Sequence, residues 1–152
     1  MQELQIKRYT RDCIPDVLAF EKELRRQEDV WGWEIDEQYK QNVADSFEKE
    51  GFENAVSFLA CQGGKVIGRI DAVLLPSHFD GSVKAYLDWI CVLKDHRHQG
   101  AAQALLAALK DYLRAQQVKT LIALTAANEE AQRFYRSIPN ALMRDTGIWI
   151  DV

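Results

Sequence analysis

The fold is decided by the stretch Ile90-Cys91-Val92-Leu93-Lys94-Asp95-His96-Arg97-His98-Gln99-Gly100-Ala101-Ala102. It ends an apolar run, residues 83–93, that predicts a buried strand, and it opens a periodic run, residues 99–117, that predicts an amphipathic helix. A strand that turns into a helix points several unpaired backbone N–H groups at one place, and the helix dipole favours an anion there. Gly100 lets the backbone approach an anion without a Cβ atom in the way. We therefore expect an anion site at residues 97–103.

Apolar periodicity on both sides of this stretch predicts an alternation of strands and helices. Strands are expected at residues 4–9, 55–60, 66–75, 83–93, 120–124 and 148–150, with a hairpin turn at Gly63-Gly64. Helices are expected after a cap at Thr10 or Asp12, and at residues 36–50, 99–117 and 129–136. The order β-α-α-β-β-β-α-β-α-β is neither that of a hairpin protein nor a regular βαβ repeat. It predicts one α+β domain over residues 1–152, with helices on the faces of a mixed sheet.

The composition fits one globular domain and excludes several classes of protein. The 152 residues are 47% hydrophobic, and a chain of this length buries roughly two-thirds of its unfolded surface. The net charge is −4 and no cluster of Lys and Arg is present, so no nucleic-acid partner is expected. No apolar run approaches the ~18 residues of a membrane span, and residues 1–4 do not resemble a signal peptide. We therefore expect a cytoplasmic protein with no membrane partner.

The spacing of the cysteines and histidines predicts neither a disulfide framework nor a metal site. Cys13, Cys61 and Cys91 form an odd, widely spaced set, which favours reduced thiols. The three histidines lack the spacing of metal ligands on a helix, so no metal is expected. Cys91 has no His placed by sequence to activate it, so we do not expect nucleophilic catalysis by this thiol.

The glycine turn differs from two other phosphate-binding motifs. No Lys-Ser or Lys-Thr pair follows Gly100, as a P-loop requires, and one Gly stands where a dinucleotide fingerprint has three. Instead, Arg97-His98-Gln99-Gly100-Ala101-Ala102 resembles the Gln/Arg-x-x-Gly-x-Gly/Ala signature of the GNAT superfamily. A second element of that family follows about 30 residues later, as Asn128, Ala131 and Phe134-Tyr135. The resemblance covers roughly residues 83–137.

The resemblance implies a three-layer α/β/α fold whose mixed, mostly antiparallel sheet contains a splayed pair of parallel strands. It implies that acetyl-CoA is the acyl donor and that the acceptor is a primary amine, here expected on a small cationic molecule. The pantetheine arm would lie between the splayed strands, and the pyrophosphate would lie on the glycine turn. The residues implied in cofactor binding are Ile90, Cys91, Val92, Arg97, His98, Gln99, Gly100, Ala101, Ala102, Gln103, Asn128 and Tyr135.

The chemistry of acetyl transfer assigns roles to two side chains. An amine that attacks a thioester expels a thiolate, and the resemblance places Tyr135 near the cofactor sulfur, where its phenol can protonate that thiolate. The attacking amine must be neutral, and some relatives carry a Glu base where this chain has Ala123. Asp88 is the candidate base, because a period of two places it on the face of Ile90 and Val92. The alternative is that Asp88 has no catalytic role and is a carboxylate at a strand end that pairs with a neighbouring Arg.

Residues 21–53 form an acidic segment with eleven Asp or Glu and five Lys or Arg, a net charge of −6. In GNAT-like folds the helices after the first strand help to wall the acceptor site. Trp31, Trp33 and Glu34 lie in this segment, and aromatic faces with carboxylates suit a cationic amine. We expect these three residues to bind the acceptor. The alternative is a solvated acidic surface with two Trp side chains filling a gap.

Residues 86–106 also resemble the type-I aminoglycoside 3-N-acetyltransferases, which share a His-Arg-x-Gln-Gly run. The match fails at one position of the strand. Those enzymes have an Asp where this chain has Trp89, and the Asp of this chain, Asp88, lies one residue earlier. Because a shift of one residue turns a side chain across the sheet, an aminoglycoside acceptor is not assigned. Two alternatives stay open: a protein acetyltransferase acting on Lys or an N-terminus, which would need an open groove, and a non-catalytic acyl-CoA sensor. Homodimer formation also stays open.

Overall fold

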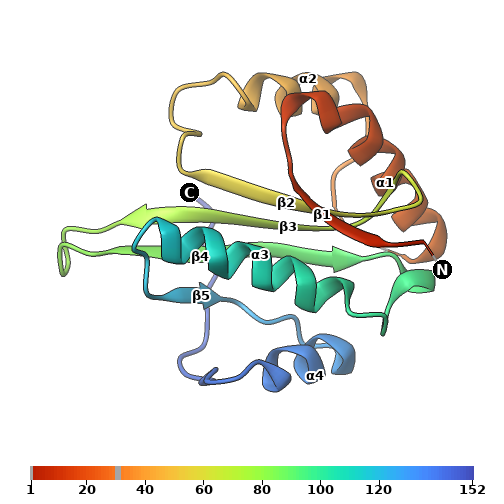
Figure 1. The fold of residues 1–152 in the computed structure, drawn as a ribbon. Coiled ribbons are helices and arrows are strands. Elements are labelled where there is room, and N and C mark those ends of the chain that lie inside the picture. Colours follow the sequence, from red (N-terminus) through yellow and green to blue (C-terminus); the bar gives the residue numbers. More distant parts are fainter. Residues whose placement is uncertain (1, 30–31) are drawn as a thin grey trace.

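The centre of the computed structural model, which describes residues 2–29 and 32–152, is one five-stranded sheet (Figure 1). The strands are β1 (Leu4–Arg8), β2 (Ala55–Gln62), β3 (Lys65–Pro76), β4 (Val83–Val92) and β5 (Leu121–Ala123). They lie side by side in sequence order, and β1 to β4 are antiparallel, while β4 and β5 are parallel. The expected mixed, mostly antiparallel sheet is therefore confirmed.

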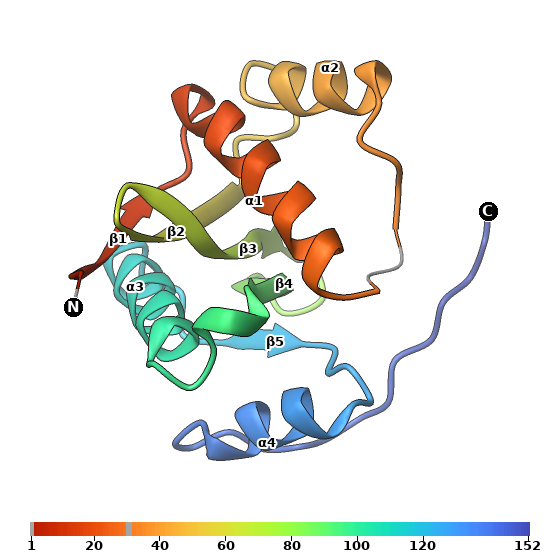
Figure 2. The same ribbon diagram turned by 90° about the vertical axis from the view of Figure 1, so that its right-hand side faces the viewer.

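Helices lie on both faces of the sheet, so the expected three layers are also confirmed (Figure 2). α1 (Ile14–Gln27) packs against β3 on one face, and α3 (Ala101–Ala115) packs across β2, β3 and β4 on the other. α2 (Glu37–Ser46) lies outside α1, and α4 (Glu129–Ser137) lies beyond β5. The 3-10 turns η1 (Arg11–Cys13) and η2 (Lys94–His96) come before α1 and α3. None of the described helices is long and apolar enough to cross a membrane.

The apolar stripes of α1 and α3 meet the sheet and form the core. Leu105 and Leu109 of α3 are fully buried, as their helical spacing predicts, and Phe20 and Leu24 of α1 cover the opposite face. Burying a side chain of this size stabilises the fold by roughly 1.5–3 kcal/mol relative to leaving it in water. The two helices therefore hold the middle strands of the sheet, and these strands carry the candidate site.

The hairpin turn and the cap of α2 are confirmed, whereas the cap expected for α1 at Thr10 or Asp12 was wrong, because the 3-10 turn η1 precedes α1 and puts Cys13 at its N-cap. The β2–β3 hairpin turns at Gly63-Gly64 with φ of +58° and +75°, as a type I′ turn requires. The N-cap of α2 is Asp36, whose carboxylate accepts the N–H of Tyr39 at 2.8 Å. α2 ends at Ser46 and not at the expected residue 50, because the chain there tightens into i→i−3 hydrogen bonds.

The strand expected at residues 148–150 is absent, so this prediction was wrong. The chain turns at residues 138–141 and forms no helix or strand after them, and Ile148, Trp149 and Ile150 are 77%, 79% and 72% exposed. Residues of this kind favour a strand only where another strand offers an edge to pack on. The segment does not meet such an edge in its own sheet.

Candidate functional site

The parallel strands β4 and β5 separate near the middle of the sheet. Their pairing stops at Leu87↔Ala123, whereas β4 continues to Val92 and the chain leaves β5 toward α4 (Figure 1). The β5-facing edge of residues 88–92 has no strand partner among the described residues. The expected splayed parallel pair is therefore confirmed.

β4 contains a bulge at Asp88. The β3 partners of its two neighbours are adjacent residues, Asp71 and Ala72, so that Asp88 itself has no partner in the ladder. A bulge adds one residue to a strand and bends it. The bulge lies between Leu87 and Trp89, so the period of two does not by itself place Asp88 on the face of Ile90 and Val92, and that shared face stays a prediction.

The turn between β4 and α3 presents a row of backbone N–H groups. His98 and Gly100 take left-handed φ of +60° and +86°, and among the described residues the amides of residues 98–103 donate to no other backbone group. A Cβ atom added at Gly100 would meet no atom within 4 Å, so the space beside the turn is open. Unpaired amides at a helix N-terminus attract anions. The turn therefore fits the pyrophosphate of acetyl-CoA.

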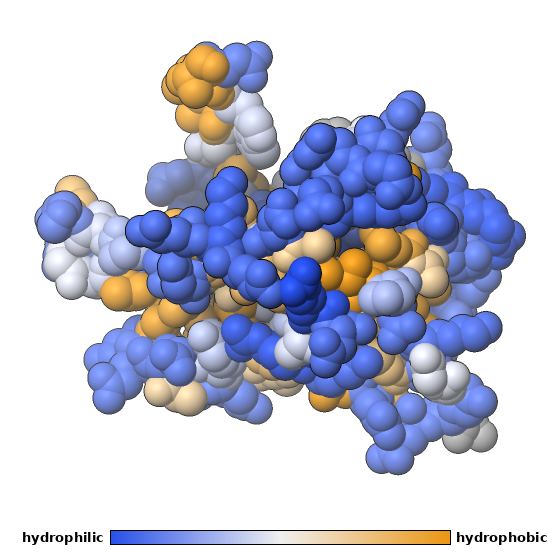
Figure 3. All heavy atoms as spheres, turned by 90° about the horizontal axis from the view of Figure 1, so that it is seen from above, coloured by the Kyte–Doolittle hydropathy of each residue, from blue (hydrophilic) through white to orange (hydrophobic). Residues whose placement is uncertain are grey.

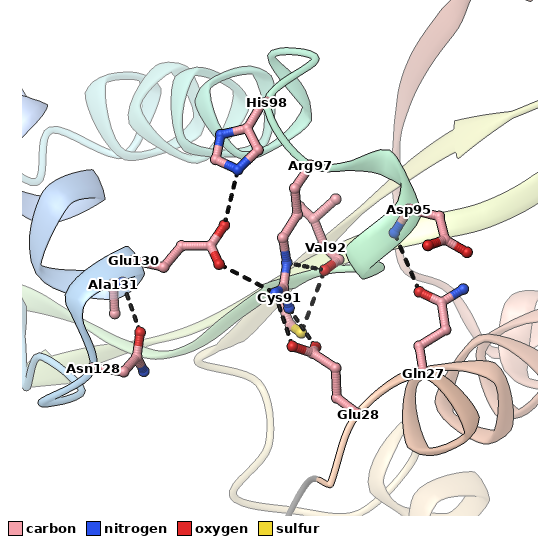
Figure 4. Close-up of polar contacts among 10 residues, drawn as sticks. All are labelled: Gln27, Glu28, Cys91, Val92, Asp95, Arg97, His98, Asn128, Glu130 and Ala131. Carbon is pink, nitrogen blue, oxygen red and sulfur yellow. Dashed lines mark hydrogen bonds and ion pairs between the residues drawn. The ribbon is translucent and has the colours of Figure 1, made fainter.

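Arg97 contacts carboxylates of the protein itself (Figure 4). Its guanidinium forms a two-pronged ion pair with Glu28 at the end of α1, and it lies 3.3 Å from Glu130 in the first turn of α4. Its Nε donates to the carbonyl of Val92 at 3.0 Å. Although partial burial opposes the effect, Glu28 and Glu130 raise the pKa of Arg97. The sequence predicted that Arg97 binds the cofactor. It did not predict the contacts with Glu28 and Glu130, because both residues lie far from Arg97 along the chain.

The other long side chains of the turn make weak contacts. His98 is 74% exposed, with its Nε2 3.4 Å from a carboxylate oxygen of Glu130, and Gln99 donates to the carbonyl of Asp95 at 3.4 Å. Gln103 is exposed. Cofactor binding by these side chains stays a prediction, and the backbone N–H groups are the feature that the fold itself positions.

The strand residues before the turn are at least half-buried. Burial raises the pKa of Cys91 to about 11, so its thiol keeps its proton at neutral pH, which supports the expectation that it is not a nucleophile. The Val92 carbonyl already accepts the bond from Arg97, so the backbone of Ile90 is the better candidate to meet the pantetheine arm. No group of three or more His, Cys, Asp or Glu suited to a metal occurs within residues 2–29 and 32–152.

α4 carries the second predicted element. Asn128 is its N-cap, and the side-chain oxygen accepts the N–H of Ala131 at 2.8 Å, so this oxygen has a structural role. Tyr135 is half-buried near the helix end, with its ring centre 5.4 Å from that of Phe134. Burial raises the pKa of Tyr135, and Tyr86 of β4 adds to the effect. The phenol therefore keeps its proton at neutral pH, as a general acid must.

A charged cluster that sequence reasoning missed lies between α1 and β3. Arg69 donates two bonds of 2.8 Å to the carboxylate of Asp71 and one of 2.8 Å to Glu21, which is only 2% exposed. Although burial opposes the effect, these carboxylates raise the pKa of Arg69. Two carboxylates around one guanidinium leave one negative charge in excess, which is costly in a buried place unless further partners meet it.

Aromatic rings extend this cluster toward the surface. The Arg69 guanidinium lies 5.4 Å from the centre of the Trp89 ring. Tyr39 donates its hydroxyl to Glu21 at 2.7 Å, and burial together with this bond raises the pKa of Tyr39 to about 12. Trp33 packs on Tyr39 with ring centres 5.5 Å apart. Contacts therefore run unbroken from the exposed Trp33 to Trp89, the residue after the bulge.

Asp88 lies within electrostatic reach of this cluster. Partial removal from water raises the pKa of Asp88, Asp71 raises it further, and Arg69 opposes them. A raised pKa suits a carboxylate that takes up and releases a proton during a reaction. Its side chain nevertheless remains exposed, so water and substrate can reach it.

Much of the acidic segment is paired within the protein. The ion pairs formed by its glutamates among the described residues are Glu21–Arg69, Glu23–Arg26, Glu28–Arg97, Glu37–Lys40 and Glu48–Arg11. Trp33 is 51% exposed, but Arg25 lies over its ring at 5.9 Å, and Glu34 is exposed. Trp31 lies outside the described residues. The acceptor role of these residues stays a prediction, and the free negative charge is smaller than the composition indicates.

Comparison with solved structures finds the same fold in several acetyltransferases. The aminoglycoside acetyltransferase meta-AAC0020, from an uncultured soil metagenomic sample and solved with trehalose and with sisomicin, has a TM-score of 0.82 at 16% identity, over 98% of this chain and 96% of that chain. AAC(6')-Iy, solved with the bisubstrate analogue CoA-S-monomethyl-acetylneamine, has a TM-score of 0.78 at 18% identity, over 99% of each chain.

A third similar structure is a ribosomal-protein-alanine N-acetyltransferase from Brucella melitensis biovar Abortus 2308. It has a TM-score of 0.74 at 16% identity, over 99% of this chain and 100% of that chain. No curated protein matches the sequence. The model of the acetyltransferase (GNAT) family matches residues 18–138. Since this match spans most of the chain, the protein belongs to the GNAT family of acetyltransferases, which use acetyl-CoA as the acyl donor.

Proposed function

We propose that the protein, as a single domain, transfers the acetyl group of acetyl-CoA to a primary amine of a small cationic molecule. The observation that carries the choice of acceptor is the cluster of Glu21, Arg69 and Asp71, which keeps one negative charge in excess beside Trp89 and the Asp88 bulge. A second positive charge on the acceptor would offset this excess, and aromatic faces attract cations.

The proposed reaction is direct attack by the amine. Asp88 takes a proton from the ammonium form of the acceptor, the freed amine nitrogen attacks the thioester carbonyl, and the C–S bond breaks. Tyr135 gives its phenolic proton to the departing thiolate, so that CoA leaves as a thiol. The new amide nitrogen releases its second proton, which restores the Tyr135 phenol, and Asp88 passes the first proton to solvent. The N–H groups of the turn at residues 98–103 hold the pyrophosphate throughout. No covalent acyl-enzyme is needed.

The relatives support this acceptor class without assigning a molecule. Meta-AAC0020, named an aminoglycoside acetyltransferase, is solved with sisomicin, and AAC(6')-Iy is solved with an acetylneamine conjugate of CoA. The similar ribosomal-protein-alanine N-acetyltransferase supports the competing acceptor, a protein N-terminus. The deciding experiment follows free CoA release with polyamines, amino sugars and peptides. Turnover only with peptides would reject the small acceptor, and tight acetyl-CoA binding without turnover would favour a sensor.

The first test concerns the base. Asp88→Asn is expected to lower kcat roughly 10²-fold at neutral pH, because the acceptor ammonium loses its proton acceptor. The difference in kcat between Asp88→Asn and the wild type should become smaller as pH rises, since more of the acceptor amine is then neutral in solution. In the unmodified protein activity is lost as pH falls through the pKa of Asp88, which is raised. The measurement is kcat/KM against pH, and an unchanged acid limb in the variant would rule Asp88 out.

The second test concerns the acceptor wall. Trp33→Ala is expected to raise the acceptor KM and to leave the acetyl-CoA KM unchanged. High salt should have the same selective effect, because the Debye length falls from about 10 Å at 0.1 M to about 3 Å at 1 M. Phe79→Ala, which removes a 93% exposed ring from the β3–β4 loop, is the control and should change neither KM. A best acceptor that is neutral, or a KM insensitive to both changes, would reject the cationic site.

A further inference from the structure

A carboxylate of α4 lies against the turn that would hold the pyrophosphate (Figure 4). Glu130 is in the first turn of α4, and its two oxygens lie 3.3 Å from Nη1 of Arg97 and 3.4 Å from Nε2 of His98. The Glu130 side chain is 47% exposed, so these two contacts, and not burial, hold it in place. The contact is therefore a surface link between α4 and the turn.

This link joins the two sides of the splayed strand pair. β4 leads into the turn and β5 leads into α4, so the turn and α4 lie on the two sides of the place where these strands separate. Within residues 2–29 and 32–152, every ion pair of α4 is formed by Glu130, and no residue of α4 is fully buried. Glu130 is therefore the charged contact that ties a loosely packed helix to the turn.

The two glutamates that meet Arg97 hold it unequally. Glu28 binds the guanidinium with both oxygens, and its Oε1 accepts from Nη1 of Arg97 at 2.8 Å. The contacts of Glu130 are longer than the 2.7–2.9 Å of a good charge-assisted hydrogen bond. Exposed ion pairs of this kind contribute little to stability. Glu130 can therefore leave Arg97 at little cost, while Glu28 keeps the guanidinium in place.

An anionic cofactor gains no general attraction from this molecule. The net charge is −4, and hydrophilic residues cover most of the face formed by α1 and α2, which hold much of the acidic segment (Figure 3). Groups near the turn therefore decide the affinity for acetyl-CoA. The N–H groups of residues 98–103 attract the pyrophosphate. The Glu130 carboxylate beside His98 repels it, because exposed charges interact over about 10 Å at 0.1 M salt.

We propose that Glu130 closes the donor site of the cofactor-free protein and that the pyrophosphate of acetyl-CoA displaces its carboxylate from Arg97 and His98. The pyrophosphate then takes the N–H groups of the turn, and the Glu130 side chain turns toward water. Because the carboxylate competes for the turn, it weakens acetyl-CoA binding and favours the release of CoA after the transfer. This inference rests on the proposed placement of the pyrophosphate at residues 98–103.

The test is the affinity for acetyl-CoA, measured by calorimetry without an acceptor. Glu130→Gln is expected to lower the Kd about two- to fivefold, the size of one exposed charge contact. Glu129→Gln is the matched control, because Glu129 is exposed, shares the first turn of α4 and forms no ion pair among the described residues. Its Kd should stay close to that of the wild type. An equal or higher Kd in Glu130→Gln, or an equal fall in both variants, would overturn the proposal.

A second measurement follows hydrogen exchange at the amides of residues 132–137. Without cofactor these amides should exchange faster in Glu130→Gln than in Glu129→Gln, because the link to the turn is lost. With saturating acetyl-CoA the two variants should exchange alike, since the cofactor has displaced the carboxylate in either case. Equal exchange in the cofactor-free variants would show that Glu130 does not hold α4 and would refute the closed state.

Gly100→Glu separates a failure of this inference from a failure of the proposed site. If Gly100→Glu loses acetyl-CoA binding and Glu130→Gln gains none, the pyrophosphate lies at the turn and the role of Glu130 alone is wrong. If Gly100→Glu binds acetyl-CoA as tightly as the wild type, the placement of the pyrophosphate is wrong and both proposals fail.

Discussion

Replacing Gly100 with Glu is expected to remove measurable acetyl-CoA binding. Gly100 has φ of +86°, and a residue with a Cβ atom loses roughly 1–2 kcal/mol in that region, or about tenfold in the population of the binding geometry. The added carboxylate then places a negative charge beside the N–H groups that would hold the pyrophosphate. Isothermal titration calorimetry with acetyl-CoA measures the loss directly.

Gly51→Glu is the matched control for this variant. Gly51 has φ of +95° and, like Gly100, nothing within 4 Å of an added Cβ atom, but it lies between α2 and β2 at the far end of the sheet (Figure 1). The Gly51→Glu variant therefore adds the same charge and a similar backbone strain without changing the turn at residues 98–103. Equal acetyl-CoA affinity in wild type and Gly100→Glu, or equal losses in both variants, would disprove binding at this turn.

Replacing Tyr135 with Phe is expected to lower kcat by ~10²–10⁴-fold, the usual contribution of a general acid. The substitution removes only the hydroxyl, and the ring contact with Phe134 remains, so the affinity for acetyl-CoA should change little. The raised pKa of Tyr135 supports the role, because the group must be protonated when the thiolate leaves. The measurement is single-turnover kinetics with saturating acetyl-CoA, which isolates the chemical step.

The control for this prediction is Tyr112→Phe. Tyr112 is a half-buried tyrosine of α3 whose ring packs against Phe58 with centres 6.1 Å apart. The Tyr112→Phe variant also loses one phenolic hydroxyl, but away from the splayed strands β4 and β5, and it should keep full activity. If Tyr135→Phe turns over as fast as this control in the single-turnover experiment, the leaving thiolate takes its proton from another source.

Sequence reasoning succeeded where a local rule determines the structure. The turn at Gly63-Gly64 needs two residues with positive φ, and the α3 stripe of Leu105 and Leu109 follows from helical spacing alone. Gly100 before an amphipathic helix marked the anion turn for the same reason. These features depend on residues that are close in sequence, so the pattern contains them.

The failures all depend on distant parts of the chain. The bulge at Asp88 is visible only when β3 supplies the register, so a simple period of two could not predict it. Glu21 reads as one more charge on an acidic helix until Arg69, 48 residues away, pairs with it in the folded chain. The strand at residues 148–150 was assigned from its composition, which cannot say whether a partner edge exists.

The ion pairs of Arg97 have a consequence for how this protein can change by mutation. Glu28 and Glu130 reach Arg97 from the end of α1 and the start of α4, so three separate segments share one electrostatic joint. Loss of Glu28 would remove the two-pronged ion pair and leave Arg97 only the 3.3 Å contact with Glu130, whereas the exposed side chains of the turn can vary with little penalty. Selection in this region is therefore expected to act on three positions that lie far apart in the chain: exposed side chains of the turn such as His98 and Gln99 can drift, while a change at position 28, 97 or 130 should favour changes at the other two.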